Sequence, residues 1–122
     1  FSSVAGHQAL ATSSVDAMTK KGLELLARSL ISEVSAYGIT VNVIAPGATV
    51  TPLTVASVPD YDPIWSQVTP TGRPAYPIDI ANAALFLLSP AASQITGQTL
   101  LVDGGWSATS PEPKSQFVDK TK

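Results

Sequence analysis

The apolar run 39-ITVNVIA-45 leaves few folds open to this 122-residue chain. It lacks the strict alternation of a half-exposed strand, and its β-branched residues favour extended backbone. The run therefore predicts a strand that is buried on both faces, as strands of parallel sheets usually are. Pro46-Gly47 ends the run, and Gly38 is placed to end a preceding helix in the left-handed conformation.

Helical periodicity lies on both sides of this run. Residues 16–37 predict a long helix with apolar residues at helical spacing and a polar opposite face. The apolar residues are Leu23, Leu26, Ala27, Leu30, Val34 and Tyr37, and the polar ones are Lys21, Glu24, Arg28, Ser32 and Ser35. The second predicted helix begins at Pro77, since proline is tolerated in a first turn. Its predicted buried residues are Ile78, Ala81, Ala84, Leu85 and Leu88.

The order of the predicted elements indicates the fold class. Residues 1–15 suit a strand end and a loop, and 99-TLLV-102 predicts a last strand before the turn Asp103-Gly104-Gly105. Alternating strands and helices predict right-handed crossovers and an α/β fold. Three strands form only part of a doubly wound sheet, and a strand ending at Ser2 would leave an unpaired edge. We therefore expect residues 1–106 to be the C-terminal half of a Rossmann-type domain, followed by a mobile polar tail at 107–122.

Two further segments predict surfaces with a function. Met18, Gly22, Leu25 and Ile31 widen the apolar stripe of helix 16–37 beyond one sheet face, which predicts a second partner such as a twin subunit. Residues 52–75 are rich in proline, threonine and aspartate and read as a long loop, which in a compact domain is often a lid. Tyr61 and Trp65 in this loop either close over a substrate or anchor the loop by packing.

Composition excludes several classes of function. A net charge of −2 and a pI near 5.1 argue against nucleic-acid binding. With no cysteine and one histidine, the chain has no disulfide, and no metal site is expected. No apolar run approaches the ~18 residues that span a bilayer, so we expect a cytoplasmic protein that does not enter the membrane. Because the chain opens on Phe1, we also expect its natural beginning to lie further upstream.

Four short segments follow one another along the chain at characteristic spacings. They are Ser3-Val4-Ala5-Gly6, then Asp16 thirteen residues after Ser3 with Lys20 four residues later, then 42-NVIAPGATVT-51, and finally 95-ITGQTLLVDGG-105. Together they resemble the C-terminal half of a short-chain dehydrogenase/reductase of the 3-oxoacyl-carrier-protein reductase or glucose dehydrogenase type. The resemblance implies hydride transfer between NAD or NADP and a small-molecule carbonyl or alcohol.

The resemblance also implies roles for individual residues. Ser3 would hold the substrate oxygen, and Lys20 would hold the nicotinamide ribose. Asp16 stands where the family has its tyrosine, the general acid or base whose pKa the lysine lowers. In the cofactor segment that includes Pro46 and Gly47, the backbone of Thr49 and the side chain of Thr51 would hold the nicotinamide carboxamide.

The chain departs from the family pattern at Asp16. An aspartate of pKa ~3.9 is ionised at neutral pH and has no proton to give. We expect it to pair with Lys20 one helical turn away, or to complement the helix dipole from the first turn. None of the three tyrosines precedes a lysine by four residues. Whether the aspartate is natural, engineered or an error stays open.

Other parts of the family pattern are missing. The chain has no Gly-rich phosphate turn and no active-site asparagine, so we do not expect it to bind a dinucleotide tightly by itself. His7 is interpreted as a loop residue beside the pocket, because no carboxylate lies near it in sequence to orient it as a base.

Three hypotheses of function follow. The first is an incomplete NAD(P)-dependent oxidoreductase, inactive as it stands. The second is a non-catalytic protein that associates with full-length relatives through helix 16–37, and the third is a decaying fragment. The sequence does not identify the substrate, choose between NAD and NADP, or fix the oligomeric state.

Overall fold

A computed structural model describes residues 1–109 of the chain. The elements in order are η1 (Val4–Gly6), α1 (Ser14–Val34), η2 (Ser35–Tyr37), β1 (Val43–Pro46), α2 (Pro52–Ser57), α3 (Tyr61–Ser66), α4 (Pro77–Leu88), η3 (Pro90–Ala92), β2 (Thr99–Val102) and η4 (Trp106–Ala108). Most of the predicted mobile tail lies outside the described residues, while its first two residues, Ser107 and Ala108, belong to η4.

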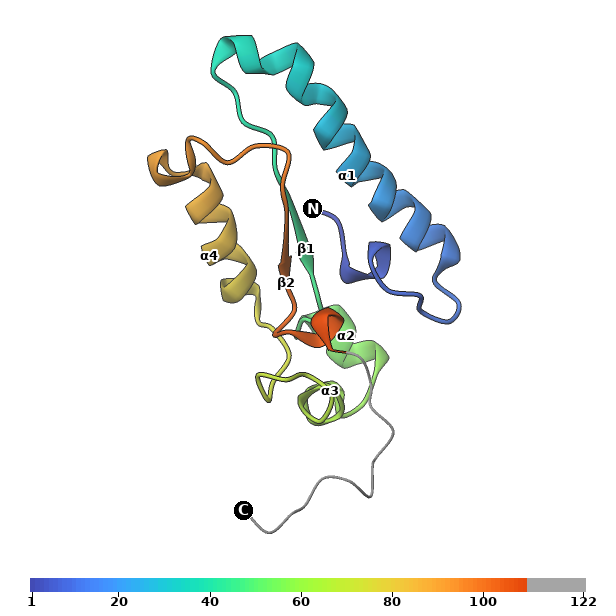
Figure 1. Ribbon diagram of the computed structural model, residues 1–122. Coiled ribbons are helices and arrows are strands. Elements are labelled where there is room, and N and C mark those ends of the chain that lie inside the picture. Colours follow the sequence, from blue (N-terminus) through green and yellow to red (C-terminus); the bar gives the residue numbers. More distant parts are fainter. Residues whose placement is uncertain (110–122) are drawn as a thin grey trace, which may run out of the picture.

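The centre of the fold is a parallel pair of strands. β1 pairs with β2 in a register that runs from Val43 opposite Thr99 to Pro46 opposite Val102. Figure 1 shows α1 on one side of the strands and α4 on the other. Extended residues 1–2 lie along the free edge of β1, where the Ser2 N–H donates to the Ile44 carbonyl at 2.8 Å. The predicted α/β fold with parallel strands is confirmed.

β1 is shorter than the predicted strand because side chains replace part of its ladder. The Val41 N–H donates to the Thr96 hydroxyl at 3.0 Å. The Asn42 amide donates to the Ile95 carbonyl at 2.7 Å and accepts from the Gln98 N–H at 3.1 Å. These bonds give partners to the backbone N–H groups of Val41 and Gln98 and to the Ile95 carbonyl before regular strand pairing begins at Val43. The turn into β1 follows the prediction, since Gly38 has a φ of 72°.

The predicted loop at 52–75 contains two short helices, so that prediction is wrong in part. Thr51 caps α2: its hydroxyl accepts from the Thr54 N–H at 3.1 Å, while the Thr54 hydroxyl accepts from the Thr51 N–H at 2.8 Å. Pro52 occupies the first turn, where its missing N–H costs nothing. Six-residue helices are too short to show periodicity, which explains why the sequence pattern did not reveal them.

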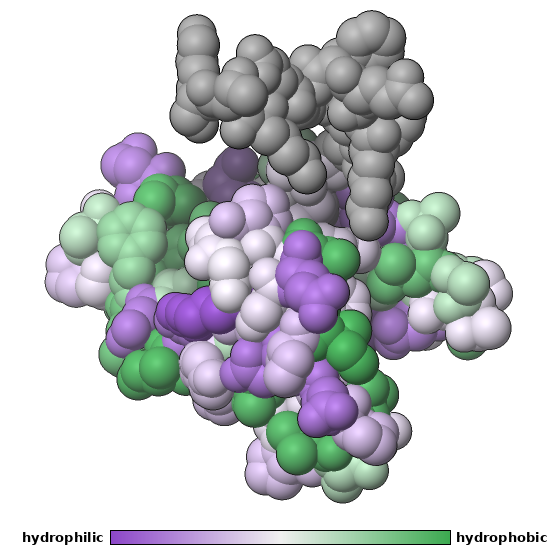
Figure 2. All heavy atoms as spheres, turned by 90° about the horizontal axis from the view of Figure 1, so that it is seen from below, coloured by the Kyte–Doolittle hydropathy of each residue, from purple (hydrophilic) through white to green (hydrophobic). Residues whose placement is uncertain are grey.

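The face of α1 that meets the sheet differs from the predicted one. Glu24, predicted to be on the polar face, is 2% exposed, although Ala27 is buried as predicted. By contrast Tyr37, predicted to be buried, is 80% exposed. Large apolar residues exposed on α1 itself are Val15, Met18, Leu23, Leu25 and Leu26, of which Leu23 and Leu26 belong to the predicted apolar face. Figure 2, seen from below Figure 1, shows apolar residues at the surface as separate green patches among polar ones.

The buried face of α4 is also shifted from its prediction. Leu88 is 83% exposed and Leu85 is 65% exposed, whereas Ala84 and Leu87 are half-buried. Because α4 is apolar almost all round, periodicity alone does not determine which side faces the strands.

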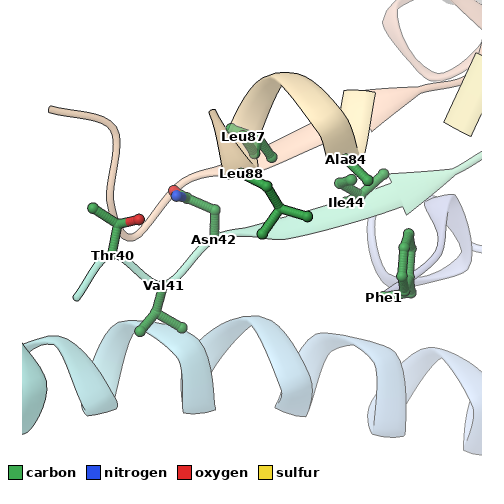
Figure 3. Close-up of a pocket in the computed structure, with 8 residues that line it drawn as sticks. All are labelled: Phe1, Thr40, Val41, Asn42, Ile44, Ala84, Leu87 and Leu88. Carbon is green, nitrogen blue, oxygen red and sulfur yellow. The ribbon is translucent and has the colours of Figure 1, made fainter. Parts of the chain in front are cut away.

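A groove of about 330 Å³ lies between α4 and the amino-terminal end of β1 (Figure 3). It is lined by Phe1, Thr40, Val41, Asn42, Ile44, Ala84, Leu87 and Leu88. None of the predicted site residues lines it. Within residues 1–109, no helix has both the length and the apolar character needed to cross a membrane.

Candidate functional site

Ser3 lies on a tight turn that packs against α1. Its hydroxyl accepts from the Ala5 N–H at 3.1 Å and so caps η1. The neighbouring Ser2 is buried, and its hydroxyl lies 3.0 Å from the Lys20 carbonyl oxygen. Gly6 allows this close contact, since a Cβ at this position would lie only 3.3 Å from the backbone nitrogen of Lys21. The serine segment, residues 1–8, therefore rests on the turn of α1 that carries Lys20.

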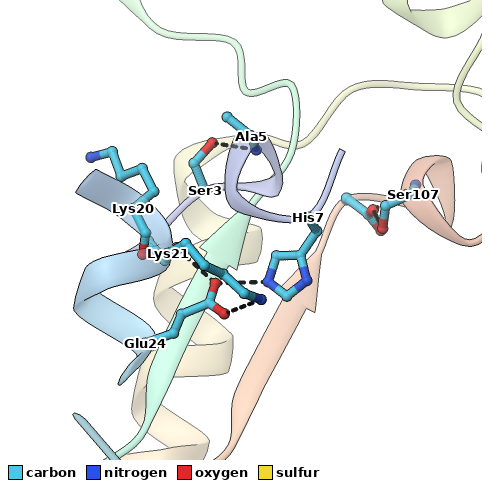
Figure 4. Close-up of polar contacts among 9 residues, drawn as sticks. Ser3, Ala5, His7, Lys20, Lys21, Glu24 and Ser107 are labelled. Atoms are coloured by element: carbon cyan, nitrogen blue, oxygen red, sulfur yellow. Dashed lines mark hydrogen bonds and ion pairs between the residues drawn. The ribbon is translucent and has the colours of Figure 1, made fainter. Parts of the chain in front are cut away.

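Asp16 and Lys20 do not form the predicted ion pair. Within residues 1–109, the ion pairs join His7 and Lys21 to Glu24, and Arg73 to Asp79. Asp16 is exposed in the first turn of α1, where its charge complements the helix dipole. Figure 4 shows the Lys20 side chain directed away from Glu24. Asp16 therefore does not hold the Lys20 ammonium in the described structure.

Glu24 is the centre of a buried polar cluster that the sequence did not reveal. Its Oε1 accepts from the Ser2 hydroxyl at 2.9 Å and lies 2.7 Å from His7 Nε2. Its Oε2 accepts from Lys21 Nζ at 2.9 Å. Burial raises the pKa of Glu24, but the hydrogen bonds from Lys21, Ser2 and His7 outweigh burial, and the net direction is downward. The orienting carboxylate that His7 lacks in sequence is thus supplied by α1 (Figure 4).

The end of β1 is held close to the end of β2. The Gly47 N–H donates to the Val102 carbonyl at 3.0 Å. A Cβ on Gly47 would lie 2.5 Å from the Cβ of Asp103, so only glycine fits here without displacement. Pro46 is the last residue of β1 and directs the chain into this turn.

Thr49 and Thr51 follow on the same segment. The Thr49 carbonyl accepts from the Thr54 hydroxyl at 3.0 Å. The Thr49 N–H takes no part in the backbone hydrogen bonds of residues 1–109 and faces the Tyr61 phenol. Burial raises the pKa of Tyr61, and the Thr49 N–H lowers it by a smaller amount. The Thr51 hydroxyl, in contrast, already serves as the cap of α2.

An aromatic cluster joins α3 to η4. The ring centroids of Tyr61 and Trp65 lie 6.0 Å apart, and those of Trp65 and Trp106 lie 5.6 Å apart in an edge-on arrangement. A hollow of about 450 Å³ lies beside Trp106. Gln8, Ala9, Leu10, Val68, Trp106 and Thr109 line it. The hollow is therefore bounded by the end of the serine segment, the segment after α3, and η4.

Polar contacts fix α3 to the start of α4. The Tyr76 hydroxyl donates to Asp62 Oδ2 at 2.7 Å, and this bond lowers the pKa of Asp62. Arg73 binds both carboxylate oxygens of Asp79, at 2.7 and 3.0 Å. The bond with Arg73 lowers the pKa of Asp79 to about 2.

The ends of both strands and the end of the serine segment lie at one edge of the sheet. Gly47 follows the carboxyl end of β1, and Asp103 follows the carboxyl end of β2. Gln8, on the serine segment, donates to the Ser107 carbonyl at 2.7 Å, which joins this segment to η4. Ligands of open α/β sheets bind outside the carboxyl ends of the strands. This edge is therefore the candidate ligand site.

Comparison with known proteins identifies the family. A family profile described as enoyl-(acyl carrier protein) reductase matches residues 1–107. The chain belongs to the short-chain dehydrogenase/reductase family. A curated relative in this family is the galactitol 2-dehydrogenase (L-tagatose-forming) of Cereibacter sphaeroides, which is 44% identical over 93 residues, covering 74% of this chain and 37% of that protein.

Solved structures of short-chain dehydrogenase/reductases have the same fold. An oxidoreductase from Burkholderia thailandensis gives a TM-score of 0.80 at 40% identity, covering 88% of this chain and 43% of that one. A gluconate 5-dehydrogenase from Burkholderia cenocepacia J2315, in complex with NADP and tartrate, gives a TM-score of 0.80 at 32% identity. This match covers 89% of this chain and 44% of that one. The chain thus spans less than half the length of these relatives.

Proposed function

We propose that residues 1–106 form the C-terminal half of an NAD(P)-dependent oxidoreductase that interconverts a carbonyl and an alcohol, and that this half is inactive as it stands. The observation that supports the proposal is the contact of the serine segment both with the Lys20 turn and with β1, the parallel strand whose carboxyl end leads into the Pro46–Thr51 segment. Family membership supports the reaction class.

The chain contributes to the nicotinamide side of the cofactor site. Lys20, whose ammonium is not held by Asp16, holds the ribose hydroxyls, and the backbone of Thr49 holds the carboxamide. The bound nicotinamide supplies or takes up the hydride. Ser3 holds the substrate oxygen, and its hydroxyl hydrogen is free to donate because the bond with Ala5 uses the oxygen only as an acceptor. This set lacks the tyrosine that serves the family as general acid or base, because Asp16 occupies its position.

The hollow beside Trp106 is the proposed space for substrate. Its lining combines apolar side chains with Gln8 and Thr109, and none of the lining residues within 1–109 is charged. The Gln8 amide is already bound to the Ser107 carbonyl. This lining favours an uncharged alcohol or ketone over a sugar acid.

A chimeric enzyme tests the proposed reaction. The amino-terminal part of the Cereibacter sphaeroides relative is joined to this chain, once with Asp16 and once with Asp16→Tyr. We expect nicotinamide-dependent oxidation of an alcohol such as galactitol only with Tyr at 16, at a rate about 100-fold or more above the Asp16 form, since positioned acid–base catalysis contributes at least that much.

Controls in the same chimera separate binding from folding. Lys20→Ala in the Asp16→Tyr background should weaken NAD(P) binding, whereas Arg28→Ala, an exposed cation further along α1, should not. If the Asp16→Tyr chimera is folded but neither binds a nicotinamide nor oxidises any alcohol, the proposed function is wrong.

A second candidate is association with other short-chain dehydrogenase/reductase chains. The observation that favours it is the exposed apolar face of α1, on which Met18 is 68% and Leu25 is 66% exposed. Sedimentation of the chain should show self-association that Leu25→Glu abolishes and Ser57→Glu, a control at an exposed position of α2, does not. A chain that sediments as a monomer and does not bind full-length relatives would exclude this function.

A further inference from the structure

Glu24 joins two segments that carry different parts of the proposed site. Ser2, next to Ser3, donates to the Glu24 carboxylate at 2.9 Å, and His7 on the same segment approaches the same oxygen at 2.7 Å. Lys21, next to Lys20, donates to the other oxygen at 2.9 Å. The carboxylate itself lies one helical turn beyond Lys20. One side chain, 2% exposed, therefore holds both ends of the serine segment against α1.

The charge of Glu24 decides how these bonds are arranged. Because the pKa of Glu24 is lowered, its carboxylate is ionised at neutral pH and only accepts hydrogen bonds. His7 Nε2 must then be the donor of the pair. The charged groups that face Glu24 are Lys21 on α1 and, when protonated, His7 on the serine segment, while Arg28 lines the same surface hollow one turn further on. β1, which packs behind α1, has no charged residue.

We propose that Glu24 is a positioning residue, which sets the place of Ser3 relative to Lys20 by holding the serine segment on α1 through an ionised carboxylate. The inference rests on the proposed function, in which Ser3 meets the substrate oxygen and Lys20 meets the nicotinamide ribose. An uncharged side chain of the same shape cannot replace Glu24, because an amide has one acceptor oxygen and adds donors where three donors already converge. Loss of the charge and of one acceptor oxygen weakens the bonds from His7 and Lys21, so we expect the serine segment to open locally more often.

Amide hydrogen exchange on the 122-residue chain tests this role. The Ala5 N–H reports directly on Ser3, since the Ser3 hydroxyl is its acceptor. Glu24→Gln should speed exchange at Ala5, Gly6 and His7 by about tenfold or more, as expected for a local opening. The N–H groups of Val43 and Gly97, bonded across the strands, should keep their wild-type rates. Glu33→Gln, an exposed glutamate on the same helix, should change neither set.

The pH profile separates the charge from mere packing. After correction for intrinsic exchange, protection of the Ala5 N–H in the wild type should fall as acid protonates Glu24, below the ordinary glutamate value of 4.5. In Glu24→Gln this pH dependence should be absent. Glu24→Asp keeps a carboxylate and should restore part of the protection together with the pH dependence.

Two outcomes overturn the proposal. If Glu24→Gln leaves the Ala5 rate unchanged, the carboxylate does not position the serine segment. If it speeds exchange equally at Ala5, Val43 and Gly97, Glu24 only stabilises the whole chain. Neither readout needs a cofactor or substrate, so failure of nicotinamide binding in the chimera refutes the proposed function without deciding the role of Glu24.

Discussion

Gly47 illustrates how the absence of a side chain brings two strand ends together. A Cβ at this position would lie 2.5 Å from the Cβ and 2.8 Å from the Cα of Asp103, and the latter is backbone that cannot rotate away. Gly22 is the opposite case: it lies on an exposed part of α1, and a Cβ there meets nothing within 4 Å. The two glycines therefore have different physical reasons to be present.

Alanine at the two positions should shift stability in opposite directions. We expect Gly47→Ala to lower the free energy of unfolding by about 1–3 kcal/mol, the usual cost of forcing extra atoms into a packed site. Gly22→Ala should raise it by about 0.5–1 kcal/mol, because glycine inside a helix loses more backbone entropy than alanine. Urea unfolding of both variants measures the difference. Equal effects of the same sign would contradict this account.

At the scale of elements, the sequence predicted those that local pattern determines. α1, α4 and β2 were found close to their true bounds because periodicity and the residues at their ends are local signals. α2 and α3 were missed because bonds such as that of Thr51 with Thr54, and not periodicity, define them. The burial of Glu24 depends on Ser2 and His7, 22 and 17 positions away in sequence, so no helical pattern could indicate it.

The same distinction applies to the candidate site. Ser3, Lys20 and Gly47 could be assigned roles because short segments at fixed spacing resemble a family, and those roles stay predictions. The prediction of an ion pair between Asp16 and Lys20 was wrong, because spacing on a helix permits such a pair but does not require it.

The position of α3 should depend on one phenol. Tyr76→Phe removes the bond to Asp62 but keeps the ring that stacks under Arg73. We expect amide exchange at Ile64, whose N–H is bonded within α3, to become about threefold to tenfold faster, which corresponds to one hydrogen bond. Tyr37→Phe, at an exposed tyrosine, is the matched control and should leave Ile64 unchanged. An unchanged rate in Tyr76→Phe would show that packing of the aromatic cluster alone holds α3.

For the molecule as a whole, carboxyl groups with lowered pKa occur in several elements. Hydrogen bonds lower the pKa of Asp62 in α3 and Asp79 in α4. Burial raises the pKa of Glu24 and of Asp103, but bonds from Lys21, Ser2 and His7, and from Ser107 and Gly105, lower each overall. A group whose folded pKa lies below its unfolded value stabilises the fold above the unfolded value and loses this contribution as pH falls through the folded value.

Acid should therefore unfold the chain progressively below about pH 4.5, the ordinary value of the glutamate. The ordinary pKa of Asp79 is 3.8, and its pKa in the fold is about 2. The stabilisation that ionised Asp79 gives the fold is therefore lost as the pH falls between these two values. Asp79→Asn should lower the melting temperature at neutral pH and make its decline between these two pH values less steep. Asp60→Asn, which removes an exposed carboxylate from the same region, should not change the slope. A slope that is the same in Asp79→Asn and the wild type would contradict the assignment.

The parallel pairing of β1 and β2 also bears on how the chain reaches this fold. Asn42 and Gln98, which bond just before the strands begin to pair, lie 56 positions apart. Contacts between residues so distant in sequence form slowly, because the entropy of closing the intervening loop is lost before any contact rewards it. During synthesis β1 leaves the ribosome well before β2 exists. Its apolar residues then pack first against α1 and later against α4, so the edge that pairs with β2 is the last part of the strand to be covered.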